Sequence, residues 1–428
     1  MNSVNAKQND SLLRFMTCGS VDDGKSTLIG RLLFDTKTIL ADTLNQMERT
    51  SKKRGLDAVD LSLLTDGLQA EREQGITIDV AYRYFSTGTR KYIIADAPGH
   101  EQYTRNMVTA ASTANLAIIL IDARKGVLTQ TRRHSYLAHL VGIPHIVVAV
   151  NKMDLINYDQ ATFEKIKSDY LVFAEQIGLQ HSGRDIKFVP LSALNGDMLV
   201  DRGESIPWYE GPTLLELLEM APAAHSEINE HFRFPVQFVC RPHASDDPEL
   251  HDFRGFMGKV ESGFISIGDN VTVLPNGINS RIKSIKLGTQ ELSEAITEES
   301  VTLLLEDEID ISRGDMIVKT GQFSDPVKQI TAMVCWLSET PLSTARTYVI
   351  RHTTRESKAK IAEISYKVDV NSLEKIPTEG LNMNDIAKVS FKLAQPLMVD
   401  SYRVNRATGA FIIIDETTNN TVGAGMII

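Results

Sequence analysis

The feature that most constrains the fold is an alternation of short apolar runs with longer amphipathic segments in the first half of the chain. Apolar runs of strand length cover residues 12–18, 80–85, 92–96, 116–122, 145–150 and 187–191. Helical periodicity covers residues 26–34, 101–113, 129–141, 160–177 and 213–219. Strands that alternate with helices of this length predict a mostly parallel sheet covered on both faces.

The pattern changes after Pro222, where short β-rich runs lie between turns rich in Gly, Pro, Asn and Asp. One block contains runs at 233–240, 256–260, 270–274 and 281–286, and a second contains runs at 330–337, 346–352, 362–370, 386–393 and 410–415. Such spacing is typical of β-barrels or sandwiches. We therefore expect an α/β domain over residues 1–224 and two β domains over 225–325 and 326–428.

Composition narrows the class of protein. Hydrophobic residues make up 42% of the 428 residues, which is typical of a folded chain, and the formal charge of −10 speaks against broad binding to nucleic acid. Three cysteines are too few for a disulfide framework. No apolar stretch approaches the roughly 20 residues that span a bilayer, and the first residues do not resemble a secretory signal. We expect a cytoplasmic protein with no membrane partner.

The sequence GSVDDGKS at residues 19–26 fits the pattern G-x-x-x-x-G-K-[ST] and directly follows the first apolar run. Glycines let backbone N–H groups curl around phosphate oxygens, and the next helix presents its positive end to them. In this role Lys25 reaches the β- and γ-phosphates, and the Ser26 hydroxyl is a ligand of Mg²⁺. The segment therefore predicts a site for a nucleoside triphosphate.

The sequence DAPG, from Asp96 to Gly99, ends the third apolar run. A carboxylate at the carboxyl end of a strand faces the crevice where ligands bind in such sheets. Asp96 can hold Mg²⁺ through a water, and the Gly99 N–H can sense a γ-phosphate.

The sequence NKMD starts at Asn151, directly after the apolar run at residues 145–150. Asp154 can accept two hydrogen bonds from the guanine N1–H and exocyclic amine, a donor pair that adenine lacks. Asn151 can brace the loop, and the stem of Lys152 can lie over the base. Ser192 and Ala193 follow a further strand and can offer a backbone N–H to the guanine O6. These residues predict GTP rather than ATP.

These three motifs, in this order on alternating strands, resemble the G domain of GTPases. The sequence REQGITI from Arg72 and the sequence DAPGH ending at His100 resemble the switch segments of translational-type GTPases. A G domain followed by two β-barrels is also the architecture of elongation factor Tu and its relatives. The resemblance therefore implies a P-loop GTPase domain with a mostly parallel sheet, followed by two β-barrel domains.

The same resemblance assigns roles to four residues. Thr77 closes over the γ-phosphate and Mg²⁺, and His100 orients the attacking water. Val21 and Ile76 form an apolar gate beside that water. The residues expected to bind GTP are Gly19, Ser20, Val21, Asp22, Asp23, Gly24, Lys25, Ser26, Thr27, Asp96, Ala97, Pro98, Gly99, His100, Asn151, Lys152, Met153, Asp154, Ser192, Ala193 and Leu194. Ser26, Thr77 and Asp96 are expected to hold the metal, Asp96 through a water.

The segments between the motifs narrow the family. Residues 64–79, 81–85, 100–107, 205–213 and 251–255 resemble the GTPase subunit of bacterial ATP sulfurylase. Elongation factor Tu has His where this chain has Asp23. The narrower resemblance implies a heterodimer in which a small subunit, subunit 2, joins sulfate to the AMP portion of ATP. The products are adenosine 5′-phosphosulfate and pyrophosphate, in the first step of sulfate assimilation. GTP and Mg²⁺ are the implied cofactors, and a higher assembly of the heterodimer is compatible with this interpretation.

Two alternatives remain at this point. A translation factor of the elongation factor 1-alpha type shares nearly every G-domain motif, although residues 331–428 hold 11 Lys plus Arg against 10 Asp plus Glu and show no basic tRNA footprint. A regulatory GTP-binding switch with negligible chemistry is disfavoured by Thr77 and His100, because both fit the hydrolytic residues of the family.

Overall fold

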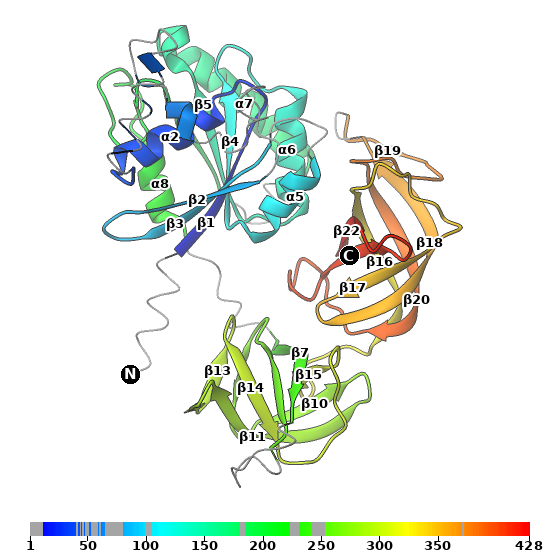
Figure 1. Cartoon of the computed structure of the whole chain (residues 1–428). Helices are drawn as coiled ribbons and strands as arrows, with labels where there is room; N and C mark the ends of the chain where they lie inside the picture. Colours follow the sequence, from blue (N-terminus) through cyan, green and yellow to red (C-terminus); the bar gives the residue numbers. More distant parts are fainter. Residues whose placement is uncertain are drawn as a thin grey trace. The chain divides into compact units, whose positions relative to one another are not determined.

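The structure is a computed structural model that describes residues 12–39, 42, 44, 47, 51–52, 59, 61–64, 80–98, 104–179, 185–222, 231–241, 253–369 and 372–428. The chain divides into two compact units, Met1–His225 with Val370–Leu373 and Ser226–Asp369 with Glu374–Ile428 (Figure 1). None of the described helices is both long and apolar enough to cross a membrane.

The first unit is built on a sheet with the strand order β2-β3-β1-β4-β5-β6. In that order the strands are β2 (Ala81–Ser86), β3 (Lys91–Asp96), β1 (Leu12–Cys18), β4 (Leu116–Asp122), β5 (His145–Asn151) and β6 (Asp185–Pro190). Only the pairing of β2 with β3 is antiparallel within this sheet. The carboxyl ends of the other strands therefore lie at one edge of the sheet.

Helices cover both faces of the sheet, as the sequence pattern predicts. They are α2 (Lys25–Asp35), α5 (Thr104–Thr113), α6 (Thr129–Leu140), α7 (Gln160–Gln176) and α8 (Leu214–Met220), with 3₁₀ turns at Leu61–Leu64 and Met153–Ile156. Apolar side chains of α2 and α8 share one core with β1, β3 and β4. The helices α5 and α6 lie on the other face (Figure 1). Strand β4 is buried along its whole length because it is central in this arrangement.

The second unit contains two closed β-barrels. The first comprises β7 (Arg233–Cys240), β8 (Gly255–Lys259), β10 (Asn270–Leu274), β11 (Ile278–Leu287), β14 (Ser300–Leu305) and β15 (Met316–Lys319), and the pairing of β10 with β11 closes it. The short strands β9 (Phe264–Ser266), β12 (Gln290–Leu292) and β13 (Glu294–Ile296) accompany it.

The second barrel comprises β16 (Val327–Trp336), β17 (Thr347–His352), β18 (Arg355–Val368), β20 (Ile386–Leu397), β21 (Ala410–Asp415) and β22 (Thr421–Ile427), and the pairing of β17 with β18 closes it. Strand β19 (Lys375–Ile376) pairs with β18. Each barrel has its own apolar core.

The predicted fold class is confirmed, with differences in element bounds. The strand expected at 187–191 begins at Asp185, because β6 pairs with β5 from that residue. The strand expected at 362–370 begins at Arg355. The predicted domain limits at 224 and 325 stay predictions.

Candidate nucleotide-binding site

The loop between β1 and α2 has a backbone that only certain residues adopt easily. Gly24 has φ 93°, and a Cβ there would lie 2.4 Å from the Nδ2 of Asn151. Asp22 also has a positive φ of 67°. Asp23 is buried, and its Oδ2 accepts the Ser20 N–H at 2.6 Å. Glycine is therefore required where the loop passes the strand-end side chain of β5.

Lys25 is buried inside this loop, with 8% of the residue exposed. Its Nζ donates to the carbonyls of Gly19 at 3.0 Å and Ser20 at 3.2 Å. Burial lowers the pKa of Lys25, and the nearby carboxylate of Asp96 opposes this shift. The ammonium is hydrogen-bonded to two carbonyls, and the nearby carboxylates of Asp96 and Asp23 only partly offset the effect of its burial. A desolvated cation of this kind favours an anionic ligand.

Two polar atoms beside Lys25 support the same conclusion. The Oγ of Ser20 and the Oδ1 of Asp23 are buried and lack a hydrogen-bond partner among the described residues. Buried polar atoms usually have partners, so unpaired atoms in a phosphate loop fit a site completed by a ligand or water.

Asp96 ends β3 beside the phosphate loop. It is 2% exposed, and its Oδ1 accepts the Thr17 Oγ1–H at 3.1 Å. Thr17 and Asp96 are also paired in the register of β1 and β3. Ser26 lies in the first turn of α2. The hydroxyl and carboxylate oxygens of Ser26 and Asp96 have the donor chemistry that Mg²⁺ prefers.

Asn151 ties three loops together at the end of β5. Its Nδ2 donates to the Asp23 carbonyl at 2.8 Å. Its Oδ1 accepts the N–H groups of Lys152 at 2.8 Å and Ala193 at 2.9 Å. The predicted bracing role of Asn151 therefore has explicit contacts. The Ala193 N–H, predicted to reach the guanine O6, is hydrogen-bonded to Asn151, so any contact with a base would be shared.

Asp154 lies beside the segment that follows β6. The Ser192 Oγ–H donates to the Asp154 Oδ1 at 2.6 Å, and the Asn195 N–H donates to the Ser192 Oγ at 3.2 Å. Leu194 is 67% exposed next to them. The hydrogen bond from Ser192 fixes one oxygen of Asp154, the carboxylate predicted to bind guanine. Leu194 adds an exposed apolar side chain next to these residues.

One candidate functional residue, Asp122, was not predicted from the sequence. Asp122 ends β4, is 1% exposed, and lies opposite Asn151 in the sheet register. It binds Arg124 and Lys152 through its carboxylate. Asp122 could have been found from the sequence by the criterion that identified Asp96, because both are carboxylates at the carboxyl end of a buried strand.

Several predicted residues lie outside the described ones. These are Thr77, Ile76, Gly99 and His100, so their roles stay predictions. Val21 is described and half-buried in the phosphate loop.

Cys18, at the end of β1, is fully buried, and burial raises its pKa to about 12, as expected for an unreactive strand-end thiol.

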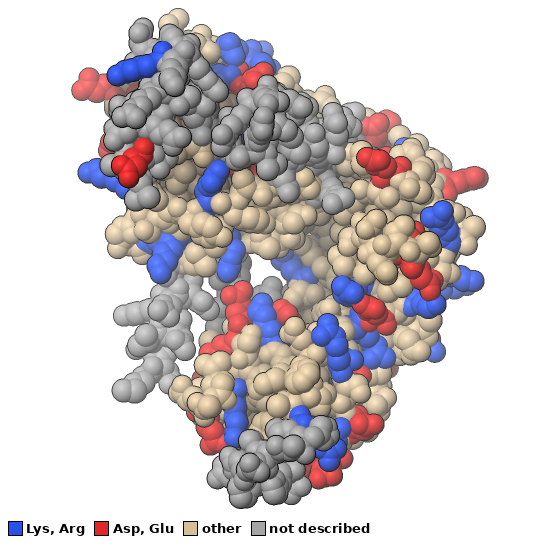
Figure 2. Space-filling model, viewed as in Figure 1, with Lys and Arg blue, Asp and Glu red and all other residues tan. Residues whose placement is uncertain are grey.

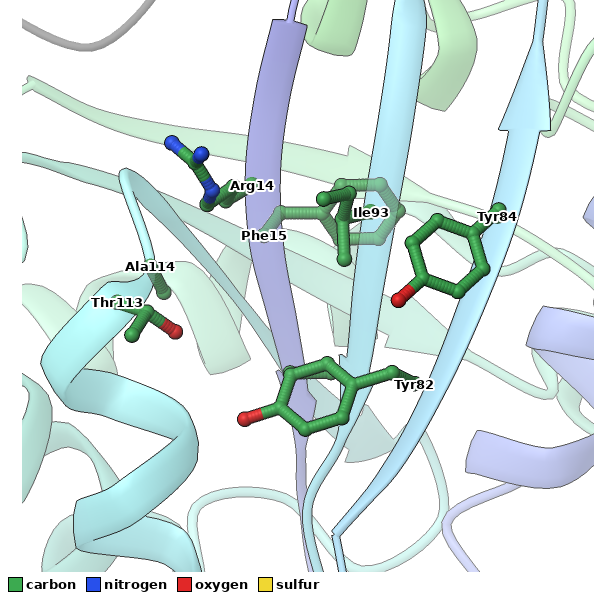
Figure 3. A pocket seen from close by; sticks show the side chains of 8 residues that line it. Arg14, Phe15, Tyr82, Tyr84, Ile93, Thr113 and Ala114 are labelled. Carbon is green, nitrogen blue, oxygen red and sulfur yellow. The ribbon is translucent and has the colours of Figure 1, made fainter. Parts of the chain in front are cut away.

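A hollow of about 250 Å³ lies against β1, β2 and β3 of the sheet (Figure 3). Tyr82 and Tyr84 project from β2 along one side of it, and Arg14, Thr113 and Ala114 lie across from them. It shares no residue with the phosphate loop or the strand ends described above, so we assign it no part in nucleotide binding.

Comparisons with known proteins agree with this geometry. The elongation factor Tu GTP binding domain family matches residues 10–226, and the GTP-eEF1A C-terminal domain-like family matches residues 329–428. Sulfate adenylyltransferase subunit 1 of Cellvibrio japonicus is 54% identical over 97% of this chain and 86% of its own length. The protein of the same name from Aliarcobacter butzleri is 54% identical over 98% of this chain and 88% of its own length.

Proposed function

The chain belongs to the sulfate adenylyltransferase subunit 1 family, and we propose that it is the GTP-hydrolysing subunit of a sulfate adenylyltransferase. The enzyme forms adenosine 5′-phosphosulfate and pyrophosphate from ATP and sulfate. The chain itself binds a guanine nucleotide and cleaves GTP, and a smaller partner subunit carries out adenylyl transfer.

One observation carries this proposal beyond the family name. The phosphate loop, the loop after β5 and the segment after β6 are joined by hydrogen bonds through Asn151. Asp96 is joined to β1, the strand that precedes the phosphate loop, by the hydrogen bond that it accepts from Thr17. These contacts support the proposal that the predicted phosphate and base contacts belong to one site at one edge of the sheet, as a single bound GTP requires.

Each end of the nucleotide has residues of suitable chemistry. The buried ammonium of Lys25 and the backbone N–H groups of the phosphate loop suit the phosphates. The carboxylate of Asp154 suits the guanine N1–H and amine, and the stem of Lys152 suits the base face. Ser26, Asp96 and Thr77 would hold Mg²⁺, which when bound neutralises phosphate charge.

The hydrolytic residues follow from the family resemblance. His100 orients the attacking water, Thr77 closes over the γ-phosphate, and Val21 and Ile76 form the apolar gate. Hydrolysis that depends on a water-orienting residue proceeds only when that residue is in place. It can therefore be coupled to a conformational change.

The thermodynamics of sulfate activation explain why a GTPase is needed. A phosphoric–sulfuric anhydride is less stable than the bond that it replaces, so equilibrium opposes the product. Coupling to GTP hydrolysis moves the reaction forward if hydrolysis depends on the partner's conformation. We propose a cytoplasmic heterodimer with the small subunit, subunit 2, and no nucleic-acid partner.

The alternative is a translation factor of the elongation factor 1-alpha type. The family match over residues 329–428 is compatible with both functions. On the face shown in Figure 2, Lys and Arg side chains are interspersed with Asp and Glu over the second unit. A tRNA-binding surface instead concentrates basic residues. The relatives' names also favour sulfate activation over translation.

A reconstituted enzyme tests the proposal. The chain is purified with its small subunit, and adenosine 5′-phosphosulfate and pyrophosphate are followed with and without GTP. We expect product formation that GTP stimulates. If neither product forms in either condition while the chain binds GTP and aminoacyl-tRNA, the translation-factor alternative replaces this proposal.

A further inference from the structure

Asp122 occupies a buried position between the two nucleotide-binding loops. It is 1% exposed at the carboxyl end of β4, and the Ala123 N–H donates to the Asn151 carbonyl at 2.9 Å. The Nζ of Lys152 lies 3.1 Å from the Oδ2 of Asp122 and also donates to the carbonyl of Asp22. The ammonium of Lys152 is therefore held between β4 and the phosphate loop.

Arg124 fixes the orientation of the same carboxylate. Its backbone N–H and its Nε donate to the Asp122 Oδ1, both at 3.0 Å, and its Nη2 donates to the Oδ2 at 2.6 Å. With both oxygens held on the Arg124 side, the Oδ2 stays directed at Lys152. Burial would raise the pKa of Asp122, but the hydrogen bonds from Arg124 and Lys152 outweigh it and hold the pKa below its usual range.

Lys152 needs such a restraint. Its backbone has φ 63°, in the left-handed region, and 23% of its side chain is exposed. A lysine side chain has four flexible carbons and loses considerable rotamer freedom when it is ordered. A side chain that is already ordered in the free protein binds its ligand without that loss.

We propose that Asp122, clamped by Arg124, is a positioning residue that holds Lys152 across the guanine pocket and so raises the affinity for guanine nucleotides. This inference rests on the proposed function, because it assumes that Lys152 lies against a bound base. Asp122 acts through Lys152 and does not touch the γ-phosphate. It therefore contributes equally to the binding of GTP and GDP.

A double-mutant cycle tests this role. The variants are Asp122→Asn, Lys152→Met, which keeps the stem and removes the ammonium, and the two combined. We expect Asp122→Asn to weaken GTP and GDP binding alike by about ten-fold, the scale of a lost charge-assisted hydrogen bond. In the Lys152→Met background the same change should alter affinity by less than about two-fold, because the interaction is already absent.

Steady-state kinetics in the complex separate positioning from catalysis. Asp122→Asn should raise the KM for GTP and leave kcat unchanged. The matched control is Asp185→Asn, the same chemical change at the start of β6. That carboxylate is 55% exposed in a surface ion pair with Lys187, so affinity should not change.

Other outcomes overturn the inference. Additive losses in the double variant would show that Asp122 acts independently of Lys152, and a loss for GTP alone would place its effect at the γ-phosphate. If Asp122→Asn does not fold, Arg124→Ala replaces it, since 45% of that side chain is exposed. It should weaken binding several-fold, but not in the Lys152→Met background. If the unmodified chain fails to bind GTP, the proposed function fails instead.

Discussion

Asp154 depends on a neighbour from another strand for its position. The Ser192 hydroxyl holds its Oδ1 at 2.6 Å, and Ser192 is itself fully buried. A carboxylate that is oriented before the nucleotide arrives can meet two donors on the edge of guanine without rearrangement. We therefore propose that base selection depends on the charge of Asp154 and on the Ser192 hydroxyl that orients it.

Changing Asp154 to Asn should move the preference from GTP toward xanthosine 5′-triphosphate. Asparagine loses one acceptor and gains a donor, which suits the carbonyl that xanthine carries in place of the amine. We expect GTP affinity to fall by about 100-fold, since each hydrogen bond to a charged group contributes about 1.5–3 kcal/mol. Competition binding measures the change. Unaltered GTP affinity would refute the role, and Asp159→Asn, at the exposed start of α7, is the control.

His100→Ala should separate binding from hydrolysis. A water-positioning group contributes on the order of 10²-fold or more to turnover and little to ground-state affinity. The expected result is nearly normal GTP binding with turnover in the complex reduced by that factor. Undiminished stimulated hydrolysis would remove His100 from the mechanism.

Helix α6 carries a buried histidine, His134. His134 is 2% exposed, and its Nε2 lies 3.0 Å from the Nε2 of Gln130. Burial, with the nearby charges of Lys25 and Arg133, lowers the pKa of His134 to about 3. The helix therefore buries a neutral imidazole that an unfolded chain would protonate.

Stability should consequently decline in mild acid. A histidine in the unfolded chain has a pKa of about 6.5, so the unfolded state takes up the proton first as the pH falls below that value. Between pH 7.5 and 5.5 this costs the folded state about 1.4 kcal/mol. Urea unfolding of the full chain and of His134→Gln at both pH values measures the difference. Equal pH dependence of the two proteins would contradict the assignment.

Element positions could be predicted where one-dimensional patterns are strong. Strand β4 has the bounds expected from the sequence because its apolar run ends sharply at Asp122. The predicted start of β18 is too late because its first inward side chains, Ser357 and Ala359, are buried but small, and Ser357 is polar. Small or hydroxyl-bearing residues can fill a barrel interior without giving an apolar alternation.

The predicted nucleotide site shows the same limit. Asn151 and Lys152 could be predicted because their motif is local in sequence. The contacts of Asp122 with Arg124 and Lys152 could not be predicted. Lys152 follows a different strand from Asp122, and the sequence Asp-Ala-Arg at residues 122–124 is not a known motif. Contacts between loops depend on strand order and register, which the sequence alone left open.

At the scale of the second unit, a buried ion pair joins the two barrels. Arg233 of β7 donates from its Nε to the Oδ2 of Asp400 at 2.8 Å, and the Thr408 Oγ1–H donates to the same oxygen at 2.5 Å. Asn405 adds a hydrogen bond from its Nδ2 to the Ser262 Oγ at 2.7 Å. These contacts tie the barrels together within this unit.

Breaking that pair should destabilise the second unit strongly. Asp400→Asn leaves the Arg233 guanidinium, whose side chain is 5% exposed, without its counter-ion. Removal of one partner of a buried pair costs about 3–5 kcal/mol. Chemical unfolding measures the loss. Lys358→Ala, in an exposed pair with Glu416, is the control and should change stability by less than about 1 kcal/mol. A similar small effect of both changes would show that the barrel junction does not depend on the pair.

For the whole molecule, we propose that GTP cleavage in the first unit drives sulfate activation in the partner subunit. The most direct test is the final amount of adenosine 5′-phosphosulfate formed by the reconstituted complex with GTP or with a non-hydrolysable GTP analogue. We predict accumulation beyond the uncoupled equilibrium only with GTP, in proportion to the GTP cleaved. Equal final amounts with both nucleotides would contradict the claim.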